Sequence, residues 1–380
     1  MLKGLCIALT AGAAFAMAGA AYAADRVQTK DVAVSVETLA TGLDHPWAVE
    51  VMPDGAYLVT ERPGTIRIIR DGKASAPLSG VPEVSARGQG GLMDVALAPD
   101  FAQTRIFYFT AAIANARGSG TEAFSAKLSA DERTLESVKP IFTMAKFTGG
   151  NIQYGSRIAI AGDGSLFISV GDRGSRDRSQ DFKDDAGSII HVNADGSIPA
   201  DNPFRDGIKA RPEIWSKGHR NPQGITFDAA DGKLYTVEHG ARGGDEINLI
   251  EPGKNYGWPV ITYGRDYSGA KIGEGTEKAG LEQPLHYWDP SIAPGAIAVY
   301  RGKMFPEWDG DMLVAALKFQ LLSRMQRDES GKFTAEERLF EGDYGRIRDV
   351  TVAPDGALLM VTDESDGALI RVSRAAGQDG

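Results

Sequence analysis

Cysteine is almost absent from this sequence: Cys6 is the only one in 380 residues. It lies in an N-terminal segment that we expect to be removed, so the mature chain would have no internal disulfide. The five histidines are scattered, without a His-x-x-x-His or Cys-x-x-Cys pairing, which argues against a zinc or iron–sulfur site. The formal net charge is −10 and no long basic run occurs, so nucleic acid and anionic membrane surfaces are not expected partners.

Long apolar runs are also missing beyond the N-terminus, where no segment approaches the ~20 residues of a membrane span. Within residues 1–23, Lys3 precedes an Ala-rich apolar run, and Ala21-Tyr22-Ala23 has the small-x-small pattern of a cleavage site. We therefore predict a signal peptide over residues 1–23 and a periplasmic protein, with a membrane anchor as the alternative.

Helical periodicity is scarce, whereas a strand pattern recurs six times. Each copy is a turn, usually Asp-Gly, followed by a short β-branched or aromatic run. The copies start at or near Asp54, Arg105, Asp163, Asp231, Asp309 and Asp355. Spacings of roughly 45 to 80 residues are typical of propeller blades with inserted loops.

We therefore predict an all-β, six-bladed β-propeller over residues 24–380, forming a single domain. The run Val34–Leu39 precedes the first repeat and is expected to complete the last blade, which would close the ring. The longest loops are expected near Asp172–Asp201 and Tyr256–Pro290. A pair of β-sandwiches is the alternative.

Cations on different repeats form the first candidate site. Lys217–Gly224 places Arg220 beside Asn221 in a turn, a pair suited to a planar anionic ligand. Lys318 follows an apolar run, and Arg346 and Arg348 would face the same way on a strand. If these cations converged on the propeller axis, they would form an anion site; taken singly, each is an ordinary surface charge.

A second candidate site is the glycine- and carboxylate-rich segment Glu238–Glu251, followed by Asn255–Pro259. Carboxylates and backbone carbonyls are calcium ligands, although no EF-hand spacing is present. A solvated hairpin is the alternative. The chain has no Gly-x-Ser-x-Gly elbow and no Gly-x-Gly-x-x-Gly opening a helix, so neither a hydrolase elbow nor a dinucleotide fold is supported.

Several longer motifs carry a family resemblance that extends over nearly all of the mature sequence. They are Gly42–Ala48, Gly88–Phe101, Gly218–Gly224, Gly243–Leu249, Lys254–Pro259 and Tyr344–Asp349. With these, the chain resembles the soluble, periplasmic aldose sugar dehydrogenases that use pyrroloquinoline quinone, the glucose/sorbosone dehydrogenase family. The resemblance implies a six-bladed propeller, in agreement with the repeat count.

The resemblance also implies roles for particular residues. The quinone would be held by Gln89, Arg220, Asn221, Lys318, Arg346 and Arg348. The backbone carbonyls of Gly240 and Ala241 would bind calcium under the cofactor, and Glu246 and Tyr256 would form a further calcium position. Trp288 and Ser291 would lie in the segment that lines the sugar side. The implied partners are an aldose substrate and an external electron acceptor.

One position departs from the family pattern. The proton-accepting His of the family stands four residues before the Arg that matches Arg157, and here that position is Gln153. A carboxamide cannot take the proton at ordinary pH. Asp172 matches a carboxylate that orients the His in some members. We hypothesise that Asp172, directly or through water and Gln153, is a weaker base. The alternatives are a propeller that binds without turnover and a calcium-dependent lactonase.

Overall fold

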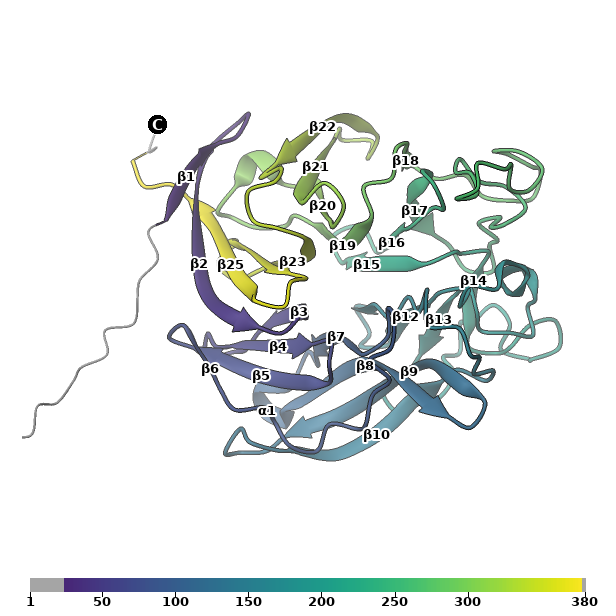
Figure 1. Ribbon diagram of the computed structural model, residues 1–380, viewed down its shortest axis with the longest axis horizontal. Helices are drawn as coiled ribbons and strands as arrows, with labels where there is room; N and C mark the ends of the chain where they lie inside the picture. Colours follow the sequence, from purple (N-terminus) through teal and green to yellow (C-terminus); the bar gives the residue numbers. More distant parts are fainter. Residues whose placement is uncertain (1–23, 378–380) are drawn as a thin grey trace, which may run out of the picture.

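The computed structural model describes residues 24–377 and arranges them as six small antiparallel sheets around one axis (Figure 1). The predicted signal peptide lies outside the described residues. Blade 1 contains β3 (Pro46–Val51), β4 (Tyr57–Glu61), β5 (Thr65–Arg70) and β6 (Lys73–Ala74). Blade 2 contains β7 (Leu92–Leu97), β8 (Ile106–Asn115), β9 (Gly118–Leu128) and β10 (Leu135–Thr143). Blade 3 contains β11 (Ile158–Ile160), β12 (Leu166–Val170), β13 (Ser188–Val192) and β14 (Ile214–Lys217).

Blade 4 contains β15 (Pro222–Asp228), β16 (Lys233–Glu238), β17 (Asp245–Ile250) and β18 (His286–Trp288). Blade 5 contains β19 (Pro294–Val299), β20 (Met312–Ala316), β21 (Leu321–Arg327) and β22 (Phe333–Leu339). Blade 6 contains β23 (Ile347–Val352), β24 (Leu358–Thr362), β25 (Gly367–Arg374), β2 (Ala33–Leu43) and β1 (Asp25–Gln28). The helices are α1 (Phe101–Thr104), η1 (Arg176–Gln180) and η2 (Pro306–Trp308). No helix in residues 24–377 is long and apolar enough to cross a membrane.

The six predicted strand runs are the second strands of the six blades, so the predicted fold is confirmed. They correspond to β4, β8, β12, β16, β20 and β24. In β12, β20 and β24 every residue is buried, because neighbouring blades cover both faces of each sheet. Continuous apolar runs after tight turns are therefore the sequence signature of this position in a blade.

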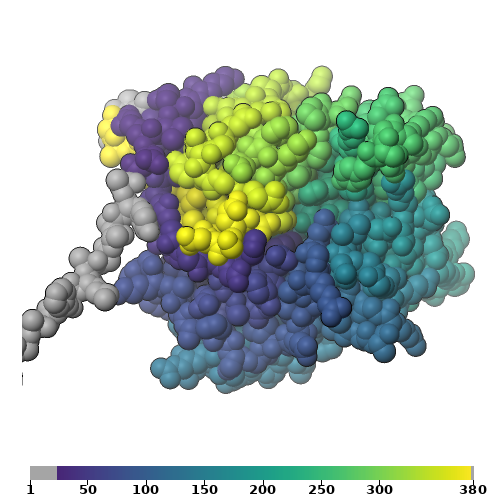
Figure 2. All heavy atoms as spheres, in the orientation of Figure 1, coloured from purple at the N-terminus to yellow at the C-terminus, as the bar shows by residue number. Residues whose placement is uncertain are grey.

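Ring closure occurs as predicted. The early strand β2 pairs antiparallel with β25, with Val36 opposite Val372, and β1 then adds the outer edge of blade 6. In Figure 2 the purple N-terminal residues accordingly lie against the yellow C-terminal ones. Strands from both ends of the described chain therefore share one sheet.

One predicted loop is interrupted. The segment Asp172–Asp201 contains η1 and the buried strand β13, so it is two loops rather than one. The strand was missed because its run, Ile189 to Val192, has no Asp-Gly turn before it. The prediction of a long loop after Tyr256 agrees with the structure, since β17 ends at Ile250 and β18 starts at His286.

Arg157, which directly precedes β11, fills the centre of the ring and contacts every other blade. Its guanidinium donates to the Asp94 carboxylate at 3.0 Å and to the Asp349 carboxylate at 2.7 Å. It also donates to backbone carbonyls of blades 4, 5 and 6, those of Gln223, Gly295 and Arg348. Its remaining face lies 4.1 Å from the Trp47 ring centre, in blade 1. The side chain is 4% exposed, so this buried cation is fully paired.

Glu50 on β3 faces the same axis without a cation of its own. Burial, followed by repulsion from Asp94 and Asp349, raises its pKa to about 8. The folded protein therefore holds a proton on Glu50 that the unfolded chain has released, and folding stability falls as pH rises from the ordinary glutamate range to about 8.

We expect Glu50→Gln to raise the melting temperature above pH 8 by about 2 °C or more and to change it little in acid, where Glu50 is neutral in both states. Thermal unfolding measured across pH tests this. Glu37→Gln, on the exposed side of β2, is the matched control. An equal effect of Glu50→Gln on the melting temperature at all pH values would contradict the raised pKa of Glu50.

Candidate functional site

The candidate residues gather at one end of the propeller because first strands begin there and second strands end there. Arg346 and Arg348 flank the start of β23, and Lys318 follows the end of β20. Gln89 lies in the loop before β7, and Gly240 follows the end of β16. Residues distant in sequence are thus brought together around the axis.

The turn that carries Arg220 and Asn221 joins β14 to β15 and is fixed by Glu238. One Glu238 oxygen accepts the Arg220 backbone N–H at 2.7 Å, and the other lies 2.9 Å from Nδ1 of His219. Gly218 opens the turn with φ +82°, and a Cβ there would lie 2.1 Å from the Asn255 side-chain oxygen. Only glycine fits this close approach, so the turn is held against the neighbouring loop.

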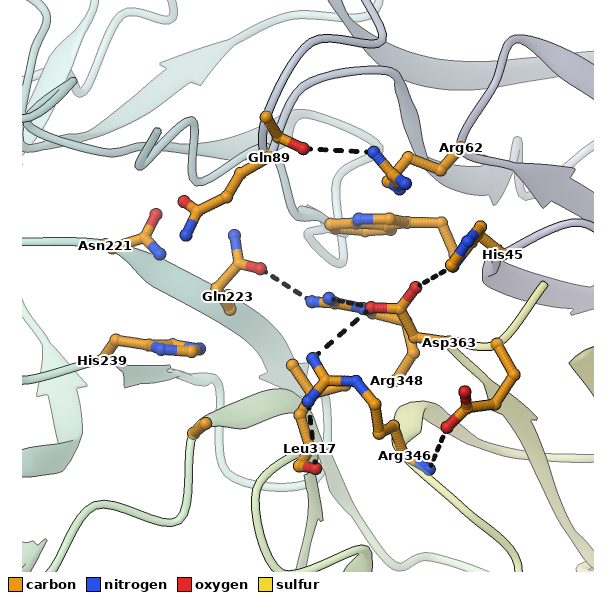
Figure 3. Close-up of a pocket in the computed structure, with 14 residues that line it drawn as sticks. His45, Arg62, Gln89, Asn221, Gln223, His239, Leu317, Arg346, Arg348 and Asp363 are labelled. Carbon is orange, nitrogen blue, oxygen red and sulfur yellow. Dashed lines mark hydrogen bonds and ion pairs between the residues drawn. The ribbon is translucent and has the colours of Figure 1, made fainter. Parts of the chain in front are cut away.

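A central cavity of about 420 Å³ lies on the axis (Figure 3). Four of the predicted quinone-binding residues line it: Gln89, Asn221, Arg346 and Arg348. They come from blades 2, 4 and 6, so residues of different repeats converge on the axis, as expected from the sequence. Further lining residues that were not predicted include His45, Trp47, Gln223, His239 and Asp363.

Two neighbouring cavities hold the other predicted cations. Lys318 and Arg346 line one of about 690 Å³, and Arg220 lines one of about 10 Å³. His239 lines all three cavities. The four cations therefore border three adjoining spaces rather than a single pocket.

Arg348 is a buried cation in the wall of the central cavity. Its side chain is about one-tenth exposed, and burial lowers its pKa. Its Nη atoms donate to Gln223 and Asp363, but its buried Nε has no hydrogen-bond partner in the described part of the chain. A buried cationic donor without a partner is costly unless a ligand completes it.

The residues around the predicted calcium position supply oxygen atoms. Gly240 and Ala241 border the second cavity, and the Arg220 guanidinium donates to the Gly240 carbonyl in this structure. The described residues contain no group of three or more His, Cys, Asp or Glu side chains that could hold a metal ion. Calcium at this position would therefore depend on carbonyl oxygens.

Glu246 and Tyr256 border the smallest cavity, together with Glu238. Burial, and then the neighbouring charge of Glu238, raises the pKa of Glu246 well above its ordinary value. Two buried carboxylates beside a space large enough for about one water molecule or ion suit a cation. The Tyr256 hydroxyl donates to the Leu249 carbonyl at 2.5 Å, so the backbone rather than the phenol is left for a metal.

Gln153 and Asp172 line none of the three spaces. The Gln153 backbone N–H donates to the Gln89 side chain at 2.7 Å. Asp172 is fully buried, and its oxygens accept from the Gly174 N–H at 2.7 Å and from Trp258 Nε1 at 2.8 Å. Burial raises its pKa, although these hydrogen bonds oppose the shift.

The two residues expected on the sugar side differ in position. Ser291 lines the second cavity, and its hydroxyl donates to Asp245 at 2.7 Å. Trp288 is buried between blades 4 and 5, where its Nε1 donates to Glu336 at 3.1 Å. Trp288 lies in the same segment but does not itself line the cavity, because β18 turns its ring into the core.

Of the unpredicted residues, Gln223 could have been found from the sequence. It follows Asn221 by two positions, so on a strand the two side chains share a face. His45 and Trp47 lie in one of the motifs that carry the family resemblance, but nothing in their spacing shows that they reach the axis. No sequence pattern around Asp363 marks it as a site residue, because its role depends on contacts with His45 in blade 1 and Arg348 in blade 6.

Fold and site together define a six-bladed propeller with a cationic cavity on its axis and backbone carbonyls beside it. Within this class, the chain matches the Glucose / Sorbosone dehydrogenase family over residues 43–371 and belongs to that family.

Its relatives include named sugar dehydrogenases. It is 44% identical over 346 residues to Aldose sugar dehydrogenase YliI of Escherichia coli, covering 90% of this chain and 93% of that protein. The apo structure of the soluble aldose sugar dehydrogenase of Escherichia coli matches with a TM-score of 0.87 at 41% identity, covering 90% and 100% of the two chains. The PQQ-bound aldose sugar dehydrogenase of Streptomyces coelicolor matches with a TM-score of 0.74 at 29% identity, covering 90% and 98%.

Proposed function

We propose that this protein oxidises aldose sugars at C1 to the lactone, with pyrroloquinoline quinone and calcium bound on the propeller axis and an external electron acceptor. The orphaned Nε of buried Arg348 in a cationic cavity carries the proposal. A planar tricarboxylate would complete the hydrogen bonding that this wall lacks. Relatives named as aldose sugar dehydrogenases, one of them solved with PQQ, support the choice of ligand.

The residues present suit this cofactor. Arg346, Arg348 and Lys318 would bind its carboxylates, and Gln89 and Asn221 would orient its ring edge. Gly240 and Ala241 would bind calcium through their carbonyls, with Glu246 and Tyr256 at a further calcium position. When bound, the quinone supplies the acceptor for the C1 hydride, and calcium polarises its carbonyl.

The chain's own contribution is orientation and exclusion of water. Glu238 fixes the turn of Arg220, so the guanidinium is held beside the Gly240 carbonyl. Gln153 can donate and accept hydrogen bonds at the edge of the cavity but cannot take the hydroxyl proton. For Asp172 to take it, a proton must reach a carboxylate whose two oxygens already accept from Trp258 and Gly174. This geometry favours a slow proton transfer.

Addition of pyrroloquinoline quinone and calcium to the apo protein is expected to change the cofactor's absorbance, and an aldose is expected to bleach it. Removing calcium with a chelator before the aldose is added should abolish the bleaching. Absorbance spectroscopy checks both steps. Binding without bleaching would instead indicate a non-catalytic binding protein. No binding, together with cleavage of a lactone, would indicate a lactonase.

A further inference from the structure

Four side chains form a continuous hydrogen-bonded wall along one side of the central cavity (Figure 3). The His45 Nδ1 lies 2.8 Å from one Asp363 oxygen, and the other Asp363 oxygen accepts from Arg348 at 2.7 Å. Arg348 also donates to the Gln223 side-chain oxygen at 2.9 Å. Gln223 in turn donates to the Gly155 carbonyl at 2.9 Å. The wall thus joins blades 1, 6 and 4 and the segment before blade 3.

Asp363 is the only carboxylate in this chain of contacts, and both of its oxygens are engaged by different donors. Burial alone would raise its pKa, but the ion pair with Arg348 and the hydrogen bond from His45 lower it to about 2. It is therefore ionised at neutral pH. An anion bound in the cavity would be repelled by Asp363 but would meet the Arg348 guanidinium that Asp363 holds in place.

The His45 ring is held in a defined orientation. Because ionised Asp363 can only accept, Nδ1 of His45 carries the hydrogen of that contact. The opposite nitrogen, Nε2, is then left for a ligand, and the side chain is 31% exposed beside the cavity. That nitrogen can form a further hydrogen bond with a molecule bound in the cavity.

We infer that Asp363 positions both His45 and Arg348 toward a ligand bound in the central cavity, and that His45 contacts this ligand through Nε2. This inference rests on the proposed function for the identity of the ligand, the tricarboxylate quinone.

Whether Asp363→Asn strengthens or weakens binding of the cofactor distinguishes a positioning role of Asp363 from a purely electrostatic one. Asp363→Asn removes a negative charge from the wall of an anion site, so a purely electrostatic role predicts tighter binding of the cofactor. A positioning role predicts weaker binding, by about tenfold or more, because Arg348 and His45 lose their shared charged partner. Calorimetric titration of the full chain with pyrroloquinoline quinone in the presence of calcium measures this.

Asp228→Asn is the matched control. Asp228 also pairs with two arginines, accepting from Arg301 at 2.8 Å and lying 3.7 Å from Arg327, but it ends β15 at the opposite end from Gln223. The Asp228→Asn substitution removes the same charge as Asp363→Asn and should leave the affinity for the quinone unchanged. Equal or tighter binding by Asp363→Asn, with the control unchanged, would overturn the positioning role.

His45→Gln tests the second half of the inference with little demand on folding. Calorimetric titration with the quinone and calcium should show that His45→Gln binds the quinone more weakly than the wild type, by about tenfold. An undiminished affinity of His45→Gln would refute the role of His45.

If the wild type fails to bind the quinone, the proposed function fails. Benzene-1,3,5-tricarboxylate, which has no redox chemistry, then becomes the probe. The same pattern across the variants with this probe would support the anion wall, and an absence of binding would reject it as well.

Discussion

Replacing Gln153 with His is expected to raise the rate of aldose oxidation by the cofactor-loaded protein by about 10²–10⁴-fold. The family resemblance implies that Gln153 occupies the position of the proton acceptor, and a carboxamide cannot take a proton. An imidazole that is neutral near pH 7 can. The backbone at this position has φ +57°, a conformation in which His is less disfavoured than most residues, so the substitution suits the local fold.

Steady-state oxidation of an aldose at saturating quinone and calcium measures the effect, with cofactor affinity determined in parallel. The gain should appear in kcat with little change in affinity, because only the side chain beside the cavity changes. Gln153→Leu is the control and should show no gain. If Gln153→His binds the cofactor as tightly as the parent protein but oxidises aldoses no faster, the account of the missing base is wrong.

Replacing Arg157 with Met is expected to destabilise the fold by about 3–5 kcal/mol, the usual cost of leaving buried charges without their partner. Asp94 and Asp349, both nearly fully buried, would lose their shared cation, and three backbone carbonyls would lose a donor. Chemical denaturation of the apo protein measures the change without dependence on the cofactor.

Arg371→Met is the matched control for this change. Arg371 also pairs with an aspartate, Asp355, but at a surface where the carboxylate is about half exposed, and an exposed pair contributes about 0–1 kcal/mol. Arg157→Lys should fall between the two, because an ammonium keeps the charge but cannot reach all five acceptors. A loss for Arg157→Met no larger than that for Arg371→Met would show that the centre of the ring contributes little to stability.

The sequence predicted the propeller because its signal is local and repeated. Each Asp-Gly turn and the buried run after it lie within about ten residues, so they can be recognised without knowing what packs against them. Closure of the ring was also predictable, since the strand-like run at Val34 precedes the first repeat and belongs to none of the six repeats. The strand β13 was missed because it lacks the turn that marks the others.

The residues that form the wall of the cavity could not be predicted from the sequence in the same way. Asp363, His45 and Gln223 come together only because the ends of three blades lie at the axis, and their spacing in the sequence does not indicate this. Arg157 shows the same limit: its motif marked it as a match to the family, but its contacts with all the other blades depend on the closed ring. The burial of the Trp288 ring was equally hidden, since it depends on residues of blades 4 and 5 that pack around it.

The pairing of β2 with β25 sets an order on the protein's assembly. During synthesis the first strands of the chain must wait for nearly the whole remainder, because their partner lies at the other end. Until that partner emerges, blade 1 has no finished neighbour on one side, and the contacts of Arg157 with Asp349 and Arg348 do not exist. A chain that still lacks blade 6 therefore has no completed pocket, and a ligand can occupy the axis only after this blade has formed.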